Sequence, residues 1–439
     1  MKTLRVGRRA KLRVGRNAIS RLLAQAGSRL VSLILVGVVT RYTGSAGLGR
    51  YVVVTTVLAL AASLTDLGLA TLLIRDTAAA PSEEAQRELL GRLLPMRLTL
   101  AAIGAALLAA PSVLSLPREI VHRPAAGAAG LAAAALLPRS GFEFLSAFFN
   151  GRRRFDVSSS VSIAVRIIAL AGGALALVSG YGVSGAVLAA AAADVLGIAA
   201  CVGILRRWRA LPRVSSSPLR WRATLATAYP FALTGIIGAA YRRLDILLLS
   251  GWQGETAAGQ YGAAHKLAET AGLIPASFLD VIFPEMAGIA GRPGGRIKLR
   301  RTARRAAIPL FLAGAALSAV GTILAAPLVH LVYGVGGAPA GTVATFRVQL
   351  WAVPAMFLYL LNGHLLYALG RQRRVTAAMA VVALVNVALN LLVIPRWSAL
   401  GVSTVSLVSA VLLWVLLAAQ ARRALRTEGK DQEQEEVAA

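Results

Sequence analysis

The chain has 439 residues, of which 57% are hydrophobic and only 15% are charged, and its net charge is +28. Soluble domains carry about 25% charged residues, so this composition indicates a membrane protein and excludes an ordinary soluble domain. The basic residues fall in short clusters between apolar runs rather than on one domain, which excludes a nucleic-acid-binding protein.

Twelve apolar runs follow one another along the chain, and each is long enough to cross the hydrocarbon core as a helix of about 20 residues. Their predicted bounds are 17–39, 47–73, 90–114, 124–149, 155–179, 181–204, 223–250, 257–288, 303–332, 341–369, 372–394 and 398–420. The sequence therefore predicts an all-α integral membrane protein with twelve transmembrane helices.

Lysine and arginine are distributed unevenly between the two sides of these runs. The N-terminal arm, every second connection and the C-terminal tail together carry 35 basic residues, with Arg97 counted in the connection before the third run. The opposite side carries five, which are Arg41, Arg50, Arg118, Arg123 and Arg396. Basic residues accumulate on the cytoplasmic side of membrane proteins, so both termini are predicted to be cytoplasmic.

Three short motifs recur in the same order in the two halves of the chain. "GSAGLGRY" (44–51) resembles "GETAAGQY" (254–261), "LAAPSVLSL" (108–116) resembles "LAAPLVHLV" (324–332), and "GYGVSGAVL" (180–188) resembles "SALGVSTVSL" (398–407). Chance similarity between segments rich in alanine and glycine is the alternative explanation. An even number of helices per repeat makes the two halves parallel, and transporters built this way bind substrate between their repeats.

The repeat predicts two six-helix lobes and divides the chain into five parts. They are a basic cytoplasmic arm (1–16), an N-lobe with helices 1–6 (17–205), a cytoplasmic linker (206–222), a C-lobe with helices 7–12 (223–420) and a polar cytoplasmic tail (421–439).

Several long stretches resemble a known family of transporters. "RYTGSAGLGRYVVVTTVLALAASLTDLGLATLLIRDTA" is similar to the first hairpin of polysaccharide and oligosaccharide flippases, and "LDILLLSGWQGETAAGQYGAAHKLAE" to their seventh and eighth spans. "LYALGRQRRVTAAMAVVALVNVALNLLVIPRWSALGVSTVSL" resembles their C-terminal half. The resemblance implies the multidrug/oligosaccharidyl-lipid/polysaccharide exporter superfamily, a two-lobed fold and alternating access. It also implies undecaprenyl-diphosphate-linked sugars as substrates, because the relatives that flip the peptidoglycan precursor have two more spans.

Thirteen charged residues lie inside the predicted spans, away from their edges. Each would cost about 2.5–3.5 kcal/mol at the centre of a lipid-facing helix, so together they must face one another or a wet cavity. They are Arg29, Asp66, Arg139, Glu143, Arg166, Asp194, Arg242, Arg243, Asp245, Lys266, Glu269, Asp280 and Arg347.

Helical spacing predicts which of these charges neutralise one another, because residues three or four apart share a helix face. Three such pairs are Arg139–Glu143, Arg242–Asp245 and Lys266–Glu269. Arg29 and Arg166 have no acidic residue within a turn on their own helices. Because a guanidinium binds phosphate oxygens in a bidentate manner and stays charged, these two are the first candidates for binding a diphosphate.

The candidate site residues fall into two groups. Arg29, Arg166, Arg242, Arg139 and Lys266 are expected to attract an anionic head group, whereas Asp66, Asp194, Asp245 and Glu143 are expected to balance charge or couple transport to an ion. Asp66 and Asp194 are expected to pair across helices with Arg29 and Arg166, or else to bind H⁺ or Na⁺. Asn386 and Asn390 form a polar stripe that predicts hydrogen bonds between helices.

Neither an enzyme nor a cofactor is expected from this sequence. It contains no phosphate-binding glycine-rich loop, no clustered carboxylates suited to Mg²⁺ and only one cysteine, Cys201, so no metal site is predicted. We therefore expect a monomeric multi-pass flippase of the inner membrane. Its expected partners are a lipid-linked anionic glycan, membrane lipid, and glycan polymerase or glycosyltransferases. The alternative is a cation-coupled multidrug exporter of the same superfamily.

Overall fold

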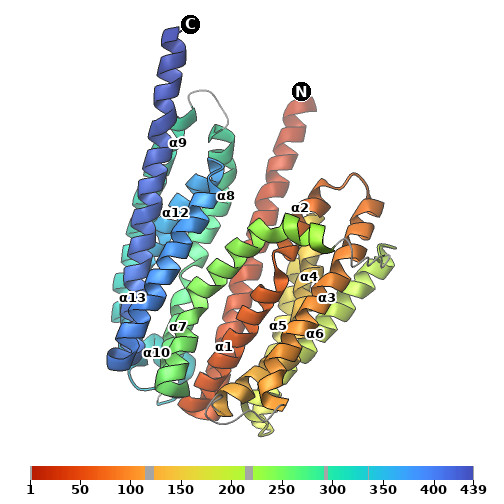
Figure 1. Cartoon of the computed structure of the whole chain (residues 1–439), viewed down its shortest axis with the longest axis vertical. Coiled ribbons are helices and arrows are strands. Elements are labelled where there is room, and N and C mark those ends of the chain that lie inside the picture. Colours follow the sequence, from red (N-terminus) through yellow and green to blue (C-terminus); the bar gives the residue numbers. More distant parts are fainter. Residues whose placement is uncertain (1, 114–122, 213–220, 291–294, 335, 439) are drawn as a thin grey trace. The chain divides into compact units, whose positions relative to one another are not determined.

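The computed structural model describes residues 2–113, 123–212, 221–290, 295–334 and 336–438, and among them only helices and their connections occur. This confirms the prediction of an all-α chain (Figure 1). The helices are α1 (Lys2–Asp66), α2 (Leu69–Ala79), α3 (Glu83–Val113), α4 (Arg123–Gly151), α5 (Phe155–Val178), α6 (Gly182–Arg207), α7 (Trp221–Thr270), α8 (Leu273–Ala290), α9 (Gly295–Ile323), α10 (Ala325–Tyr333), α11 (Thr342–Leu350), α12 (Val353–Ala368) and α13 (Gln372–Ala438).

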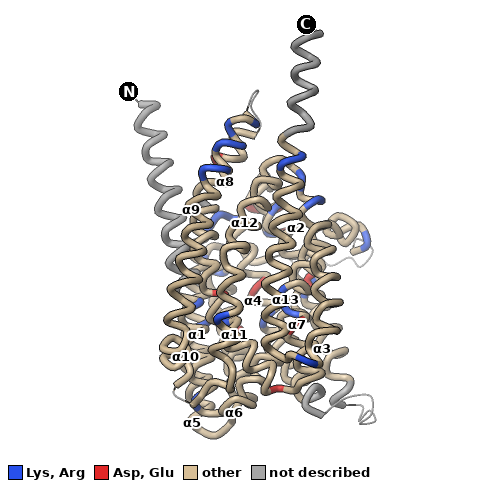
Figure 2. The backbone as a smooth tube through the Cα atoms, turned by 90° about the vertical axis from the view of Figure 1, so that its left-hand side faces the viewer, with Lys and Arg blue, Asp and Glu red and all other residues tan. Residues whose placement is uncertain are grey.

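Seven helices are long and apolar enough to cross a membrane, and the number becomes eight if the bent pair α11–α12, which turns by 41°, is one span. Large apolar side chains on these helices are exposed, among them Leu107 at 70% and Ile323 at 76%, which suits contact with lipid tails. Basic residues occupy the first turns of α9, and the rest of that helix carries none (Figure 2). The chain is therefore a multi-span membrane protein.

Three of the seven candidate helices are longer than one crossing requires. These candidate segments are Gly27–Asp66, Trp221–Leu279, which runs from α7 into α8, and Gln372–Leu425. They contain 40, 59 and 54 residues, whereas a single span needs about 20. Each contains one residue with a non-helical backbone, namely Gly44 in α1, Gly254 in α7 and Ser398 in α13. The number of crossings stays a prediction.

The breaks in α1 and α7 have nearly the same backbone conformation. Gly44 has φ 68° and ψ −167°, and Gly254 has φ 80° and ψ −179°. Only glycine readily adopts this combination of angles. These glycines occupy the same position in the motifs "GSAGLGRY" and "GETAAGQY". The backbone therefore repeats where the sequence repeats, which supports an internal duplication.

Backbone contacts divide the chain into two compact units. The first contains residues 1–250, 254–259 and 332–339, and the second contains 251–253, 260–331 and 340–439. The lobe boundary predicted at 206–222 lies partly outside the described residues and stays a prediction.

The first unit has its core between α2, α3, α4 and α6. Leucine and phenylalanine side chains fill this core, including Leu73, Leu90, Phe144, Phe148 and Phe149. A close approach of two backbones also belongs to this unit, because a Cβ atom on Gly259 would lie only 2.9 Å from the backbone nitrogen of Gly49. The core of the second unit lies between α8, α9 and α12, where Leu279, Leu310 and Phe357 pack together.

Candidate functional site

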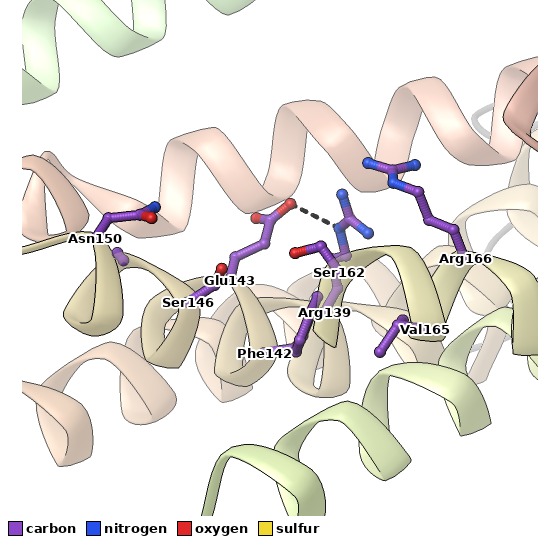
Figure 3. A pocket seen from close by; sticks show the side chains of 9 residues that line it. Arg139, Phe142, Glu143, Ser146, Asn150, Ser162, Val165 and Arg166 are labelled. Atoms are coloured by element: carbon purple, nitrogen blue, oxygen red, sulfur yellow. Dashed lines mark ion pairs between the residues drawn. The ribbon is translucent and has the colours of Figure 1, made fainter. Parts of the chain in front are cut away.

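A stripe of polar residues runs along one face of α4. Arg139, Glu143, Ser146 and Asn150 follow at intervals of four, three and four residues, which places them on one side of an α-helix. A matching stripe on α5 contains Ser158, Ser162 and Arg166 at intervals of four. The two helices are joined by a short turn at 152–154, so they run antiparallel and their polar stripes face each other (Figure 3).

The two stripes line a half-open cavity of about 190 Å³ within the first unit. Asn150 and Ser146 lie toward one end of it and Arg166 toward the other, with Glu143, Ser162 and Arg139 between them (Figure 3). The lining residues are Arg139, Phe142, Glu143, Ser146, Ala147, Asn150, Ser162, Val165 and Arg166. The cavity therefore combines cationic, anionic and neutral hydrogen-bonding groups in a small space.

Arg139 is the most heavily compensated charge of this cavity. Its Nε lies 2.7 Å from Oε1 of Glu143, which confirms the predicted pair on α4. Its Nη1 lies 3.8 Å from Oδ1 of Asp194 on α6, whose side chain is 8% exposed. The two carboxylates thus share one guanidinium.

Arg166 has a different environment. It is half-buried and forms no ion pair or side-chain hydrogen bond with any residue that the structure describes. Arg139, Asp194, Glu143 and the hydroxyl of Tyr51 lie within electrostatic reach of it. Because Glu143 is bonded to Arg139, the guanidinium of Arg166 keeps its donors available for a ligand in the cavity.

A second charged cluster lies next to this cavity, and sequence reasoning missed its central residue. Arg97 is 2% exposed, and its Nε lies 3.3 Å from Oδ1 of Asp66. Its terminal nitrogens donate to Thr65 Oγ1 at 3.0 Å, Ala62 O at 3.2 Å and Ser140 Oγ at 3.0 Å. Arg97 therefore joins α1, α3 and α4. Sequence reasoning placed this residue in a connection, whereas α3 carries it into the protein core.

Asp66 pairs with Arg97 and not with Arg29 or Arg166, which corrects the expected partners. Its carboxylate also accepts a hydrogen bond from the backbone nitrogen of Ala70 at 3.3 Å. That nitrogen lies in the first turn of α2, after the break in which Leu67 and Gly68 have positive φ angles. The Asp66 side chain thus stabilises the restart of the helix in addition to compensating a buried cation.

The remaining predicted residues lie outside this cavity. Arg29 is half-buried on α1, whereas Arg242 is exposed on α7. The predicted Arg242–Asp245 pair is wrong, because Arg242 forms no ion pair with a described residue. Asp245 is 5% exposed and accepts a hydrogen bond from the backbone nitrogen of Ile246 at 2.8 Å.

Two predictions in the second unit are confirmed. Lys266 Nζ lies 3.2 Å from Oε2 of Glu269. Asn390 donates to Asn386 at 2.9 Å, and Asn386 donates to Ser409 at 2.9 Å, so this stripe joins the two parts of α13 on either side of Ser398. The side chain of Asp280 and the basic arm lie outside the described side chains.

The neutral end of the cavity is the other feature that sequence reasoning missed. Ser146 and Asn150 line it, whereas sequence reasoning singled out only charged residues in α4 and α5. Their spacing from Arg139 was a visible signal, because it continues the same helix face. Among the described residues no group of three histidine, cysteine or acidic side chains is arranged to hold a metal ion.

Two family models match the sequence. The model described as a polysaccharide biosynthesis protein matches residues 14–290, and the model described as the lipid II flippase MurJ matches residues 255–436. No curated protein matches the chain significantly.

Solved structures with a similar fold cover almost the whole chain. A lipid II flippase MurJ in an inward closed conformation has a TM-score of 0.76 at 13% identity, covering 93% of this chain and 89% of that one. An inward-facing multidrug resistance MATE transporter has a TM-score of 0.67 at 16% identity, covering 94% and 99%. A transporter of the MOP superfamily from Pyrococcus furiosus has a TM-score of 0.63 at 15% identity, covering 94% and 96%. These likenesses establish the fold.

Proposed function

We propose a function that proceeds from one established premise: this chain belongs to the polysaccharide biosynthesis protein family, whose model matches well over half of its length. It is a multi-span membrane protein with the fold of the MurJ and MATE transporters. We infer that it is a flippase that carries a polyprenyl-diphosphate-linked oligosaccharide from the cytoplasmic to the outer leaflet of the inner membrane by alternating access. We propose that the protein acts as a monomer, and that glycosyltransferases or a glycan polymerase supply or consume its substrate.

The observation that carries this proposal is the cavity that contains Arg139 and Arg166. A guanidinium with available donors favours an anionic head group, because it forms charge-assisted, bidentate hydrogen bonds with phosphate. A cationic drug would be repelled by Arg166. The prenyl tail need not enter this cavity, since it can remain in the lipid.

The proposed topology has twelve spans and two cytoplasmic termini. Splitting the three overlong helices at Gly44, Gly254 and Ser398 gives segments of suitable length for separate crossings. The uneven distribution of basic residues between alternate connections supports the same arrangement. Twelve spans favour a lipid-linked oligosaccharide over the peptidoglycan precursor.

Transport in reconstituted vesicles tests the function. The chain would be inserted into liposomes with a fluorescent lipid-diphosphate-linked oligosaccharide, and its movement between leaflets would be followed by a membrane-impermeant quencher. We expect Arg166→Gln to slow flipping by at least about tenfold, since a charged hydrogen bond is worth roughly 1.5–3 kcal/mol. Arg373→Gln is the matched control, because Arg373 is exposed and lies in the second unit.

Two outcomes would count against the proposal. Equal flipping by the wild type and by Arg166→Gln would remove the site assignment. Extrusion of a cationic dye with no movement of the lipid-linked sugar would support the alternative, a multidrug exporter. The similarity of the fold to that of a MATE transporter favours this alternative over other transporter classes.

A further inference from the structure

We propose that the cavity between α4 and α5 contains two chemically distinct subsites for one head group. Arg166, with Arg139 beside it, forms a cationic subsite that takes the diphosphate. Ser146 and Asn150 form a neutral subsite that takes the first sugar, and Ser162 lies between the two subsites. This inference rests on the proposed function and specifies how the substrate is oriented.

The antiparallel register of the two helices creates this division. Asn150 and Ser158 are in direct contact near the connecting turn, because Ser158 Oγ donates to Asn150 Oδ1 at 2.6 Å. Farther from the connection, Ser146 is followed along the cavity by Glu143, and Ser162 on α5 lies beside Arg139. Arg166 lies at the end opposite to Asn150 (Figure 3). With a rise of about 1.5 Å per residue, the eleven residues from Asn150 to Arg139 span roughly 16 Å.

The groups at the neutral end have unused hydrogen-bonding capacity. Many hydroxyls elsewhere on the helices donate to a carbonyl of their own helix, as Thr55, Ser277 and Ser318 do. Ser146 makes no such bond, nor any other side-chain hydrogen bond with a described residue, and the same holds for Ser162 between the two subsites. The bond from Ser158 uses only the oxygen of the Asn150 amide, so the two N–H donors of Nδ2 remain available.

These free groups match the chemistry of a sugar. Sugar hydroxyls donate and accept hydrogen bonds, and serine hydroxyls and an amide do the same without a net charge. A diphosphate binds more strongly at the other end of the cavity, because Arg166 provides a charged hydrogen-bond donor there.

Glu143 fixes the direction of the head group. Its carboxylate is 45% exposed and remains bonded to Arg139, so it would repel a diphosphate placed over it. A diphosphate therefore binds on the Arg166 side, with the sugar extending past Glu143 toward Asn150. In this arrangement the cationic subsite is common to all lipid-linked substrates, and the neutral subsite determines which sugar is accepted.

Binding to the purified full-length protein separates the two subsites. The probes are farnesyl diphosphate without a sugar and farnesyl diphosphate carrying one N-acetylglucosamine, and the dissociation constants are measured by microscale thermophoresis. We expect Asn150→Ala and Ser146→Ala to raise the dissociation constant of the sugar-bearing probe by about three- to tenfold, which corresponds to the loss of one hydrogen bond. The dissociation constant of the bare diphosphate should change less than about twofold. Arg166→Gln should raise the dissociation constants of both probes by about tenfold or more.

Two control variants separate a direct contact from a folding effect. Ser158→Ala removes the hydrogen bond that orients Asn150 but leaves the amide in place, and Ser277→Ala removes a hydroxyl of the second unit that is bonded to Leu273. We expect the first to have a smaller effect than Asn150→Ala and the second to have none.

The possible failures are distinguishable. If Arg166→Gln weakens both probes while the variants at Ser146 and Asn150 bind the sugar-bearing probe as the wild type does, the two-subsite inference is overturned and the proposed function stands. If the variants at Ser146 and Asn150 weaken the binding of both probes equally, the two-subsite inference is also overturned. If Arg166→Gln changes neither probe, the anionic site itself is wrong.

Discussion

Arg97 shows how a cation can be kept in the interior of a membrane protein. It is almost fully buried, yet it has an ionic partner in Asp66 and three further oxygen acceptors on two other helices. A buried charge is tolerated only when it is paired and hydrogen-bonded. The cluster links α1, α3 and α4, because the partners of Arg97 come from both of the other helices.

The first prediction concerns this cluster. Arg97→Met should reduce the free energy of unfolding by about 3–5 kcal/mol, because it leaves the carboxylate of Asp66 without its ionic partner. The double variant Asp66→Asn with Arg97→Met should recover part of this loss, since neither charge then remains. Chemical denaturation in detergent measures both, with Arg153→Met, an exposed residue, as the control. A single variant as stable as the wild type would show that the ion pair contributes nothing.

The second prediction concerns Glu143. Glu143→Gln should tighten the binding of bare farnesyl diphosphate several-fold, because it removes a negative charge from the cavity and releases Arg139 from its strongest partner. The increase should shrink at high salt, since screening weakens the interaction of exposed charges. Titration at low and high ionic strength measures both effects. Weaker binding in this variant would mean that Glu143 holds Arg139 in its productive position.

Sequence spacing predicted charge pairs within one helix better than pairs between helices. It identified Arg139–Glu143 and Lys266–Glu269, because both partners project from one face. The same rule failed for Arg242 and Asp245, where one side chain is exposed and the other is buried. No rule based on one helix could pair Arg97 with Asp66, since that contact depends on how separate helices pack.

At the scale of the helices, the main features are the breaks in three long helices. Apolar runs located these segments from the sequence, but hydropathy does not reveal whether two neighbouring runs are joined by a loop or by one bent helix. In the structure two helices meet directly at each of Gly44, Gly254 and Ser398, where a single residue leaves the helical conformation. For the first two, the repeated glycine in the motif was the available sequence signal.

The third prediction tests the conformational need for glycine at such a break. Gly254→Ala should destabilise the protein by about 1–3 kcal/mol, because its backbone angles are accessible almost only to glycine. Gly251→Ala is the matched control, since that residue lies in the same helix and a Cβ atom there would meet no neighbour within 4 Å. Thermal unfolding of the two variants decides the question. Equal stability would contradict the assigned backbone conformation.

At the scale of the whole molecule, the proposed topology follows from alternating charge. The turn between α4 and α5 carries Arg152, Arg153 and Arg154, whereas the turn between α5 and α6 carries Ser179, Gly180 and Tyr181. These turns lie at opposite ends of α5. If α5 crosses the membrane, they lie on opposite sides.

The fourth prediction uses this difference. In a Cys201→Ala background, Arg153→Cys should react with a membrane-impermeant thiol reagent only after the cells are opened, because the basic turn is cytoplasmic. Tyr181→Cys, at an exposed position, should react in cells whose outer barrier alone has been made permeable. Labelling of both positions from the same side would exclude the proposed number of crossings.

The most direct test of the anionic site is protection of a single thiol inside the cavity. In the Cys201→Ala background, Ser162→Cys places a thiol of nearly the same size between the two subsites, and its rate of modification is measured with farnesyl diphosphate, with the neutral alcohol farnesol, and with neither. We predict that the diphosphate slows modification several-fold, that farnesol has no effect, and that Arg166→Gln abolishes the protection. Equal rates with and without the diphosphate would contradict the binding of an anionic head group between α4 and α5.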